Sequence, residues 1–123
     1  MAERKEERFD YRDMTGSDDD LLDAWLVFEF LDNLKGAIVD ISLKGIGFQI
    51  SGISREMSEI LAEKKDYFLK IHAGEEFFLA GVKNRWYVVE KDLYRGGVEI
   101  EIISPDDSVR LNNLITALRR IKE

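Results

Sequence analysis

Cysteine is absent from the 123 residues, and histidine and proline each occur only once. A chain without cysteine has no disulfide framework, no thiolate metal site and no cysteine nucleophile. His72 has no second histidine to form a two-histidine metal site, and it is expected to be an exposed strand residue. No stretch approaches the roughly 20 apolar residues of a membrane-spanning helix, and the start of the chain lacks a signal-peptide core. We therefore expect a cytoplasmic protein with no metal site and no membrane insertion.

Basic residues are missing from one long segment, residues 13–34, which carries seven acidic side chains. The rest of the chain has 18 residues of each sign, so the whole net charge of −7 arises in this segment. Nucleic-acid binding depends on a basic field over the phosphates, so no DNA or RNA partner is expected. There is also no P-loop, no hydrolase nucleophile elbow and no marked carboxylate pair. The sequence thus predicts no catalytic residues and a protein that is not an enzyme.

Length and pattern are consistent with one domain that is mostly β. We divide the chain into a flexible charged arm, residues 1–12, and a barrel domain, residues 13–123, which begins with an acidic loop at 13–20. Closely spaced short strands predict an antiparallel barrel. The expected strands are 25–31, 37–43, 46–50, 67–73, 77–82, 85–89 and 97–103, with turns at 33–36, 73–75 and 95–97.

Two helices are expected beside the strands. A short inter-strand helix at 54–65 would begin at Ser54 as the N-cap, with an apolar stripe formed by Met57, Ile60, Leu61 and Lys64. The stronger signal is a C-terminal helix at about 105–122, with Ser104 as the N-cap and Pro105 in the first position. Its apolar stripe consists of Leu111, Leu114, Ile115, Leu118 and Ile121.

Polar residues interrupt one of these strands. Asp and Gly are depleted in strands, yet Asp40 and Gly45 lie within or beside an otherwise apolar stretch. Strand alternation would place Asp40 and Ser42 on one face, about 6.6 Å apart, and Ile41 and Leu43 on the other. Gly45 would permit a turn or bulge. This pattern predicts a polar binding surface, and a strand-end Asx or Ser turn is the alternative.

A pair of arginines near the start of the chain complements this surface. The guanidinium groups of Arg8 and Arg12 could engage the O6 and N7 acceptors of guanine and pair with phosphate. The carboxylate of Asp40 could accept the N–H donors of the same base. The alternative is a solvated charged tail. The two tryptophans, Trp25 and Trp86, are expected in the barrel core or at its edge rather than as stacking platforms.

An RxxxR arm followed by Asp-x-Ser-x-x-Gly resembles the PilZ domain, a bacterial receptor for the second messenger cyclic di-GMP. Residues 39–48 look like the signature strand of that family, and residues 94–100 with the terminal helix look like its closing strand and cap. The resemblance extends from Arg8 to Ile121. It implies a six-stranded antiparallel barrel, cyclic di-GMP as the ligand, and the ligand-binding residues Arg8, Arg12, Asp40, Ser42 and Gly45.

Two features of the site stay open within this resemblance. Arg4 and Arg8 also have RxxxR spacing, but we prefer Arg8 and Arg12 because family arms often carry aromatic residues between the arginines. Lys44, inside the motif, is a secondary candidate that could approach a phosphate. The acidic loop departs from the family pattern, and we expect its residues 18–20 to compete with the ligand for the arginines. Replacing those three aspartates with asparagine should then tighten binding.

The resemblance implies a receptor or adaptor that changes its surface when the nucleotide binds. We expect no attached effector domain, so the output would be regulation of a protein partner, which the sequence does not identify. An arm that orders on binding is a physically sensible switch. The alternative is a PilZ-like interaction module that does not bind the nucleotide.

Overall fold

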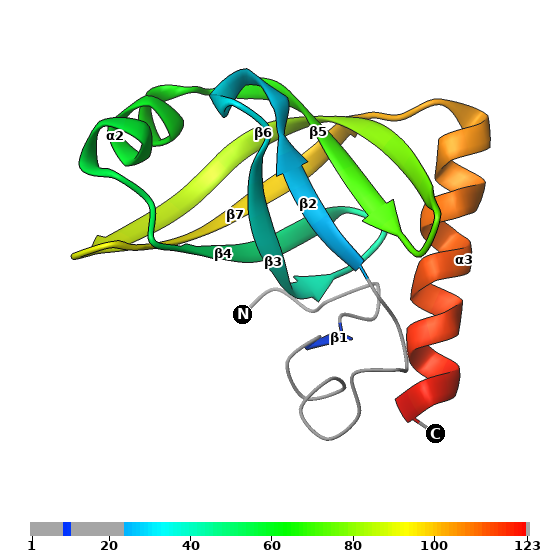
Figure 1. Ribbon diagram of the computed structural model, residues 1–123. Coiled ribbons are helices and arrows are strands. Elements are labelled where there is room, and N and C mark those ends of the chain that lie inside the picture. Colours follow the sequence, from blue (N-terminus) through cyan, green and yellow to red (C-terminus); the bar gives the residue numbers. More distant parts are fainter. Residues whose placement is uncertain (1–8, 11–23, 123) are drawn as a thin grey trace, which may run out of the picture.

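Six antiparallel strands, β2 to β7, close into a barrel that carries two helices on different sides (Figure 1). This computed structural model describes residues 9–10 and 24–122. The strands pair in the order β3-β2-β5-β6-β7-β4, and β4 pairs back with β3 to close the barrel. The predicted six-stranded antiparallel fold is confirmed. Its elements are β1 (Phe9–Asp10), β2 (Ala24–Phe28), the 3₁₀ turn η1 (Glu29–Leu31), β3 (Leu34–Ile41), β4 (Gly45–Ser51), α2 (Arg55–Glu63), β5 (Asp66–Ala73), β6 (Glu76–Glu90), β7 (Leu93–Ile102) and α3 (Pro105–Lys122).

The long strand β6 unites two of the strand segments expected from the sequence pattern. Seven separate strands were expected, but residues 77–82 and 85–89 belong to one strand that pairs with β5 in its first half and β7 in its second. A change of register between Asn84 and Trp86 marks a bulge that lets the strand continue. The turn that connects β6 to β7 lies further along the chain, at Lys91, whose φ of 54° is in the left-handed region.

The predicted turn at residues 95–97 is wrong because its two glycines lie inside β7. A Cβ at Gly96 would lie 2.8 Å from Cζ of Phe48, and one at Gly97 would overlap the indole of Trp86. These glycines therefore make room for neighbouring rings. The sequence alone does not distinguish a glycine that permits a turn from one that permits the close approach of a neighbouring side chain.

The first barrel strand is shorter than expected. Strand β2 ends at Phe28 and passes into η1, where residues 25–31 were predicted to be strand throughout. Asp32 and Asn33 then adopt left-handed φ values of 57° and 59°. Asparagine and aspartate tolerate this conformation better than other residues with a Cβ. The turn is thus confined to these residues, and β3 begins at Leu34.

The short strand β1 was not expected from the sequence. Phe9 pairs with Ile41 and Asp10 with Asp40, so β1 adds to the edge of β3. The rest of the arm and the acidic loop, with their predicted site residues Arg4, Arg8 and Arg12, lie outside the described residues, as do the aspartates at 18–20. The boundary between arm and barrel therefore remains a prediction.

Helix α2 begins where its cap predicts. The Oγ of Ser54 accepts a hydrogen bond from the N–H of Met57 at 3.1 Å. The expected stripe is only partly right, since Ile60 is 45% exposed while Ser58 is buried beside Leu61. The hydroxyl of Ser58 donates within the helix to a carbonyl oxygen, which satisfies it in the interior.

Helix α3 contributes four side chains to the barrel core. Leu111, Leu114, Ile115 and Leu118 are buried with the apolar residues of the strands, as their helical spacing predicted. The Oγ of Ser104 accepts from the N–H of Asp107 at 3.1 Å, which confirms the predicted cap. Over the residues that the structure describes, neither α3 nor any other helix is long and apolar enough to cross a membrane.

Candidate functional site

The candidate site is a row of four residues that crosses the outer face of the barrel. Asp40 of β3 pairs with Gly47 of β4, Gly47 pairs with Gly97 of β7, and Gly97 pairs with Trp86 of β6. Directly paired residues of antiparallel strands place their side chains on the same face. The row therefore has two glycines in its centre, with a carboxylate at one end and an indole at the other.

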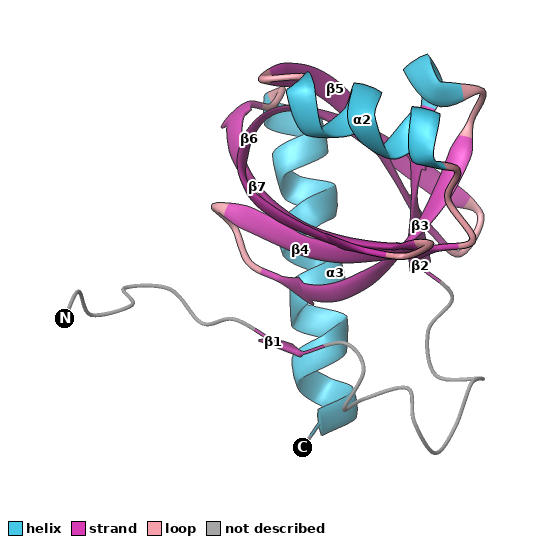
Figure 2. Ribbon diagram, turned by 90° about the vertical axis from the view of Figure 1, so that its left-hand side faces the viewer, coloured by secondary structure: helices cyan, strands magenta, loops and turns pink. Residues whose placement is uncertain are grey.

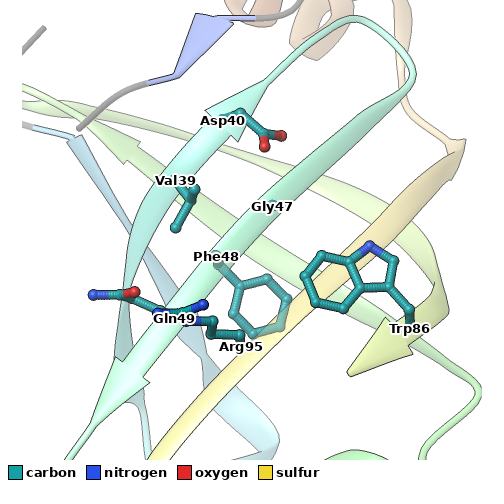
Figure 3. A pocket seen from close by; sticks show the side chains of 7 residues that line it. All are labelled: Val39, Asp40, Gly47, Phe48, Gln49, Trp86 and Arg95. Atoms are coloured by element: carbon teal, nitrogen blue, oxygen red, sulfur yellow. The ribbon is translucent and has the colours of Figure 1, made fainter. Parts of the chain in front are cut away.

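Both end groups lean inward over the glycines. A Cβ at Gly47 would lie 2.9 Å and 3.0 Å from the two carboxylate oxygens of Asp40, and Figure 3 shows this carboxylate directed toward Gly47. At the other end, a Cβ at Gly97 would lie 2.7 Å from Cε2 of Trp86. The missing side chains thus let the carboxylate and the indole lie low across neighbouring strands.

A pocket of about 140 Å³ lies between Asp40 and Trp86 (Figure 3). Phe48 forms part of its lining although this ring is almost fully buried, while Trp86 is 51% exposed. Gln49 and Arg95, which pair with each other, contribute polar groups from β4 and β7. The remaining lining residues are Val39 and Gly47.

A bulge in β3 explains why two consecutive residues face this pocket. Ile38 pairs with Phe48 and Asp40 with Gly47, so Val39 is the extra residue. A bulge suspends the strict alternation of side chains and re-aims those beside it. Val39 and Asp40 both line the pocket for this reason.

The pocket rests on stacked aromatic rings. The ring of Phe48 lies 6.0 Å from that of Tyr94 at an interplanar angle of 10°. Burial, with a smaller effect of the nearby Tyr87, raises the pKa of Tyr94 to about 12, although a hydrogen bond with Asn84 acts in the opposite direction. The phenol is therefore neutral at physiological pH and forms part of the support rather than a charged group of the site.

Ser42 lies in the turn that follows Asp40 and is fully buried. Its Oγ accepts hydrogen bonds from the N–H groups of Lys44 and Gly45, each at 3.2 Å, and its own N–H donates to the carbonyl oxygen of Gly45 at 2.9 Å. The predicted alternation of Asp40 and Ser42 on one strand face is wrong, because β3 ends at Ile41. Ser42 thereby holds the turn beside the site.

Two further predicted site residues flank this turn. Lys44 is exposed, and its carbonyl oxygen accepts from the N–H of Ile100 at 2.8 Å. Gly45 is buried at the first position of β4 and pairs with Glu99. Of the five residues assigned to the ligand, the structure describes Asp40, Ser42 and Gly45, and it places them along one connection between β3 and β4.

Of the seven residues that line this pocket, only Asp40 was identified from the sequence as a site residue. Trp86 was expected in the core or at the edge, and Arg95 was placed in the predicted turn at 95–97. The one local signal was the pair of glycines in β7, which could have indicated a ring lying over the strand. Their relation to Asp40 depends on strand register. In the part of the chain that the structure describes, no three His, Asp or Glu side chains gather as metal ligands.

Comparisons with known proteins agree with this architecture. No family model matches the sequence, and no curated protein does either. Solved structures do match over nearly the whole chain. YcgR of Escherichia coli in complex with c-di-GMP has a TM-score of 0.64 at 16% identity, with 98% of this chain and 47% of that chain covered. The MrkH–c-di-GMP complex of K. pneumonia has a TM-score of 0.68 at 14% identity, with coverages of 96% and 53%.

The present chain spans about half the length of these two proteins. A third structure, the PilZ domain of YcgR from Escherichia coli with c-di-GMP, is matched over 97% of this chain and 93% of its own length. The TM-score is 0.58 at 16% identity. Together with the six-stranded closure and the terminal helix, this match shows that the chain has the fold of a PilZ domain.

Proposed function

We propose that this protein is a cyclic di-GMP receptor or adaptor without enzymatic activity, which regulates a protein partner. The observation that carries the proposal is the cross-strand row from Asp40 to Trp86, with its pocket over two glycines. The structures of YcgR, of its PilZ domain and of MrkH, which have the same fold, contain c-di-GMP. Their ligand suits the chemistry of this row.

The pocket has the groups that a guanine base requires. A carboxylate such as that of Asp40 accepts hydrogen bonds from N–H donors of the base, and the indole of Trp86 offers an apolar ring face. Pockets for drug-sized ligands have roughly 300–1,000 Å³. We therefore assign one base to this pocket of about 140 Å³, and the rest of the dinucleotide to the surface around it.

The phosphates would be held by arginines. Arg95 lines the pocket, and guanidinium groups bind phosphate through paired hydrogen bonds. Arg8 directly precedes Phe9, whose strand β1 pairs with β3 beside Asp40. Arg8 and Arg12 flank this strand in the sequence, whereas Arg4 lies further from it, which supports Arg8 and Arg12 as the working pair in preference to Arg4 and Arg8.

Titration calorimetry with cyclic di-GMP tests the proposal. We expect saturable binding to the wild-type chain, and loss of at least about tenfold in affinity for Arg12→Ala, since a charged hydrogen bond contributes about 1.5–3 kcal/mol. Arg110→Ala is a matched control, because this arginine lies on α3 and pairs with Asp107 at 2.9 Å. Absence of binding to the wild type would refute the receptor and favour an interaction module that does not use the nucleotide.

A further inference from the structure

The second half of β6 has a strand neighbour on one side only. Strand β5 pairs with β6 no further than Lys83, whereas β7 continues to pair with it as far as Glu90. Among the described residues, no strand pairs with Arg85–Glu90 on the side away from β7. Backbone N–H and C=O groups along such an edge can accept an added strand.

Helix α2 lies beside this part of the barrel (Figures 1 and 2). Residues of the helix and of the strand together line a groove between them. It consists of two hollows of about 290 Å³ and 280 Å³, and both are lined by Ala62 and Tyr87. The amide of Asn84 fixes the helix at one end, since its Nδ2 lies 3.2 Å from the carbonyl oxygen of Lys64. We refer to this feature as the α2–β6 groove.

The strand wall of the α2–β6 groove is apolar and exposed. Tyr87 is 49% exposed and Val89 is 42% exposed, and both face the hollows beside α2. They belong to a run of four consecutive exposed apolar residues, Trp86 to Val89. Natural edge strands are usually protected by charge, proline or a covering segment. An unprotected apolar edge of this kind indicates a surface that another segment covers.

Charges make the two ends of the groove different. Lys64, Lys65 and Arg85 line one hollow. The other is lined by Glu63 and by Glu59, which pairs with Arg55 of the same hollow at 3.5 Å. Arg85 is paired with Glu99 at 3.3 Å and Lys64 lies over the ring of Phe30, whereas Lys65 has no ionic partner within the described part of the chain. A carboxylate on the occupant would find its complement at the Lys65 end.

We propose that the α2–β6 groove binds an extended segment of a protein partner, which adds as a strand to Arg85–Glu90. Alternate apolar side chains of that segment would cover Tyr87 and Val89, and its acidic end would lie beside Lys65. A second copy of this chain fits less well. It would have to bring the same edge, with its own α2 beside it, into a groove that α2 already bounds.

The groove also adjoins the proposed nucleotide site. Trp86 lines both the pocket beside Asp40 and the hollow beside Lys65. The inference therefore adds two things to the proposed function: the kind of protein partner and the surface that binds it. Only the role of this docking in signalling rests on the proposed function. Docking itself is tested without the nucleotide, so the two can fail separately.

The experiment uses a random dodecapeptide library displayed on phage and selected on the full wild-type chain without nucleotide. We expect enriched peptides with alternating apolar residues and carboxylates at one end. Titrated into the ¹⁵N-labelled chain, a synthetic copy should shift the amide signals of Arg85–Glu90. Affinity should fall about tenfold or more in Tyr87→Lys, since a buried aromatic contact often dominates binding. Val88→Lys, on the opposite face of the same strand, is the matched control and should stay within about twofold.

Several results would overturn the inference. The selection could yield no binding peptide, or the peptide could shift only amide signals outside Arg85–Glu90. Tyr87→Lys and Val88→Lys could also lose affinity for the peptide to the same extent. Concentration-dependent dimerisation that Tyr87→Lys abolishes would identify a second copy as the occupant instead. Cyclic di-GMP binding measured on Tyr87→Lys separates the two proposals, because this side chain does not line the nucleotide pocket and its loss should leave that binding intact.

Discussion

Replacing Gly47 with alanine should weaken cyclic di-GMP binding while leaving the fold in place. The new Cβ would lie 2.9 Å and 3.0 Å from the carboxylate oxygens of Asp40 and 3.1 Å from its Cγ, closer than carbon and oxygen normally approach. These atoms form the end of a side chain that can rotate, so the carboxylate rather than the backbone would move. The substitution should therefore weaken ligand binding and have little effect on the stability of the barrel.

The magnitude follows from the interaction that is lost. A hydrogen bond to a charged group contributes about 1.5–3 kcal/mol. Every 1.4 kcal/mol is about tenfold in affinity, so the dissociation constant of Gly47→Ala should rise by about 10- to 100-fold. Stability should change by less than about 1 kcal/mol, because Gly47 does not have a positive φ and alanine reduces the entropy of the unfolded chain.

Calorimetry and thermal unfolding of the wild type and four variants would measure both quantities. Gly81→Ala is the matched control, because its Cβ would lie 3.2 Å from both Ile102 and Phe68, outside the proposed nucleotide pocket. The double variant Asp40→Ala with Gly47→Ala should bind no worse than Asp40→Ala alone, since both changes remove the same contact. Wild-type affinity in Gly47→Ala, or fully additive losses in the double variant, would refute the reasoning.

Three further predictions concern stability. Ser42→Ala removes a buried side-chain oxygen that accepts from two backbone N–H groups, so the free energy of unfolding in urea should fall by about 1–3 kcal/mol. Replacing the exposed Ser51 with alanine should change it by less than about 0.5 kcal/mol. Leu111→Ala should cost about 2–5 kcal/mol because the side chain is fully buried between α3 and the barrel, and a loss no larger than that of the exposed Val109→Ala would contradict this packing. Burial raises the pKa of Tyr94 to about 12, so the stability due to its neutral form is fully present below about pH 10 and is lost as the pH rises toward 12. Unfolding free energies between about pH 9 and 11.5 should therefore fall less steeply in Tyr94→Phe than in the wild type, and identical slopes would argue against the shift.

Local signals predicted the elements whose cause is local. The Ser54 and Ser104 caps are side-chain bonds to backbone groups three residues away, so each helix start could be located from the chain alone. The apolar stripe of α3 likewise follows from helical periodicity. Ile60 was misassigned because periodicity does not say which neighbour covers a stripe, and the described contacts leave this residue exposed.

Glycines led to the main errors about the strands. Gly96 and Gly97 were interpreted as a turn, but they lie within β7 because rings from β4 and β6 pass over them. The rings of Phe48 and Trp86 come from distant parts of the sequence. The turn propensity of glycine describes only which backbone conformations are allowed. Here the absence of a side chain instead leaves space for these two rings.

The sequence by itself determined the β-rich barrel, both helices, and Asp40 as a polar group on one of the strands. It also located the charge imbalance in residues 13–34. Tertiary structure alone decided that Asp40, Gly47, Gly97 and Trp86 form one row, and that Ser42 is buried in the turn rather than exposed beside Asp40. The physical reason is that a closed barrel sets the register of each strand through the bulges and pairings of all the others. Which side chains meet across four strands is therefore a property of the closure, and no short stretch of sequence contains it.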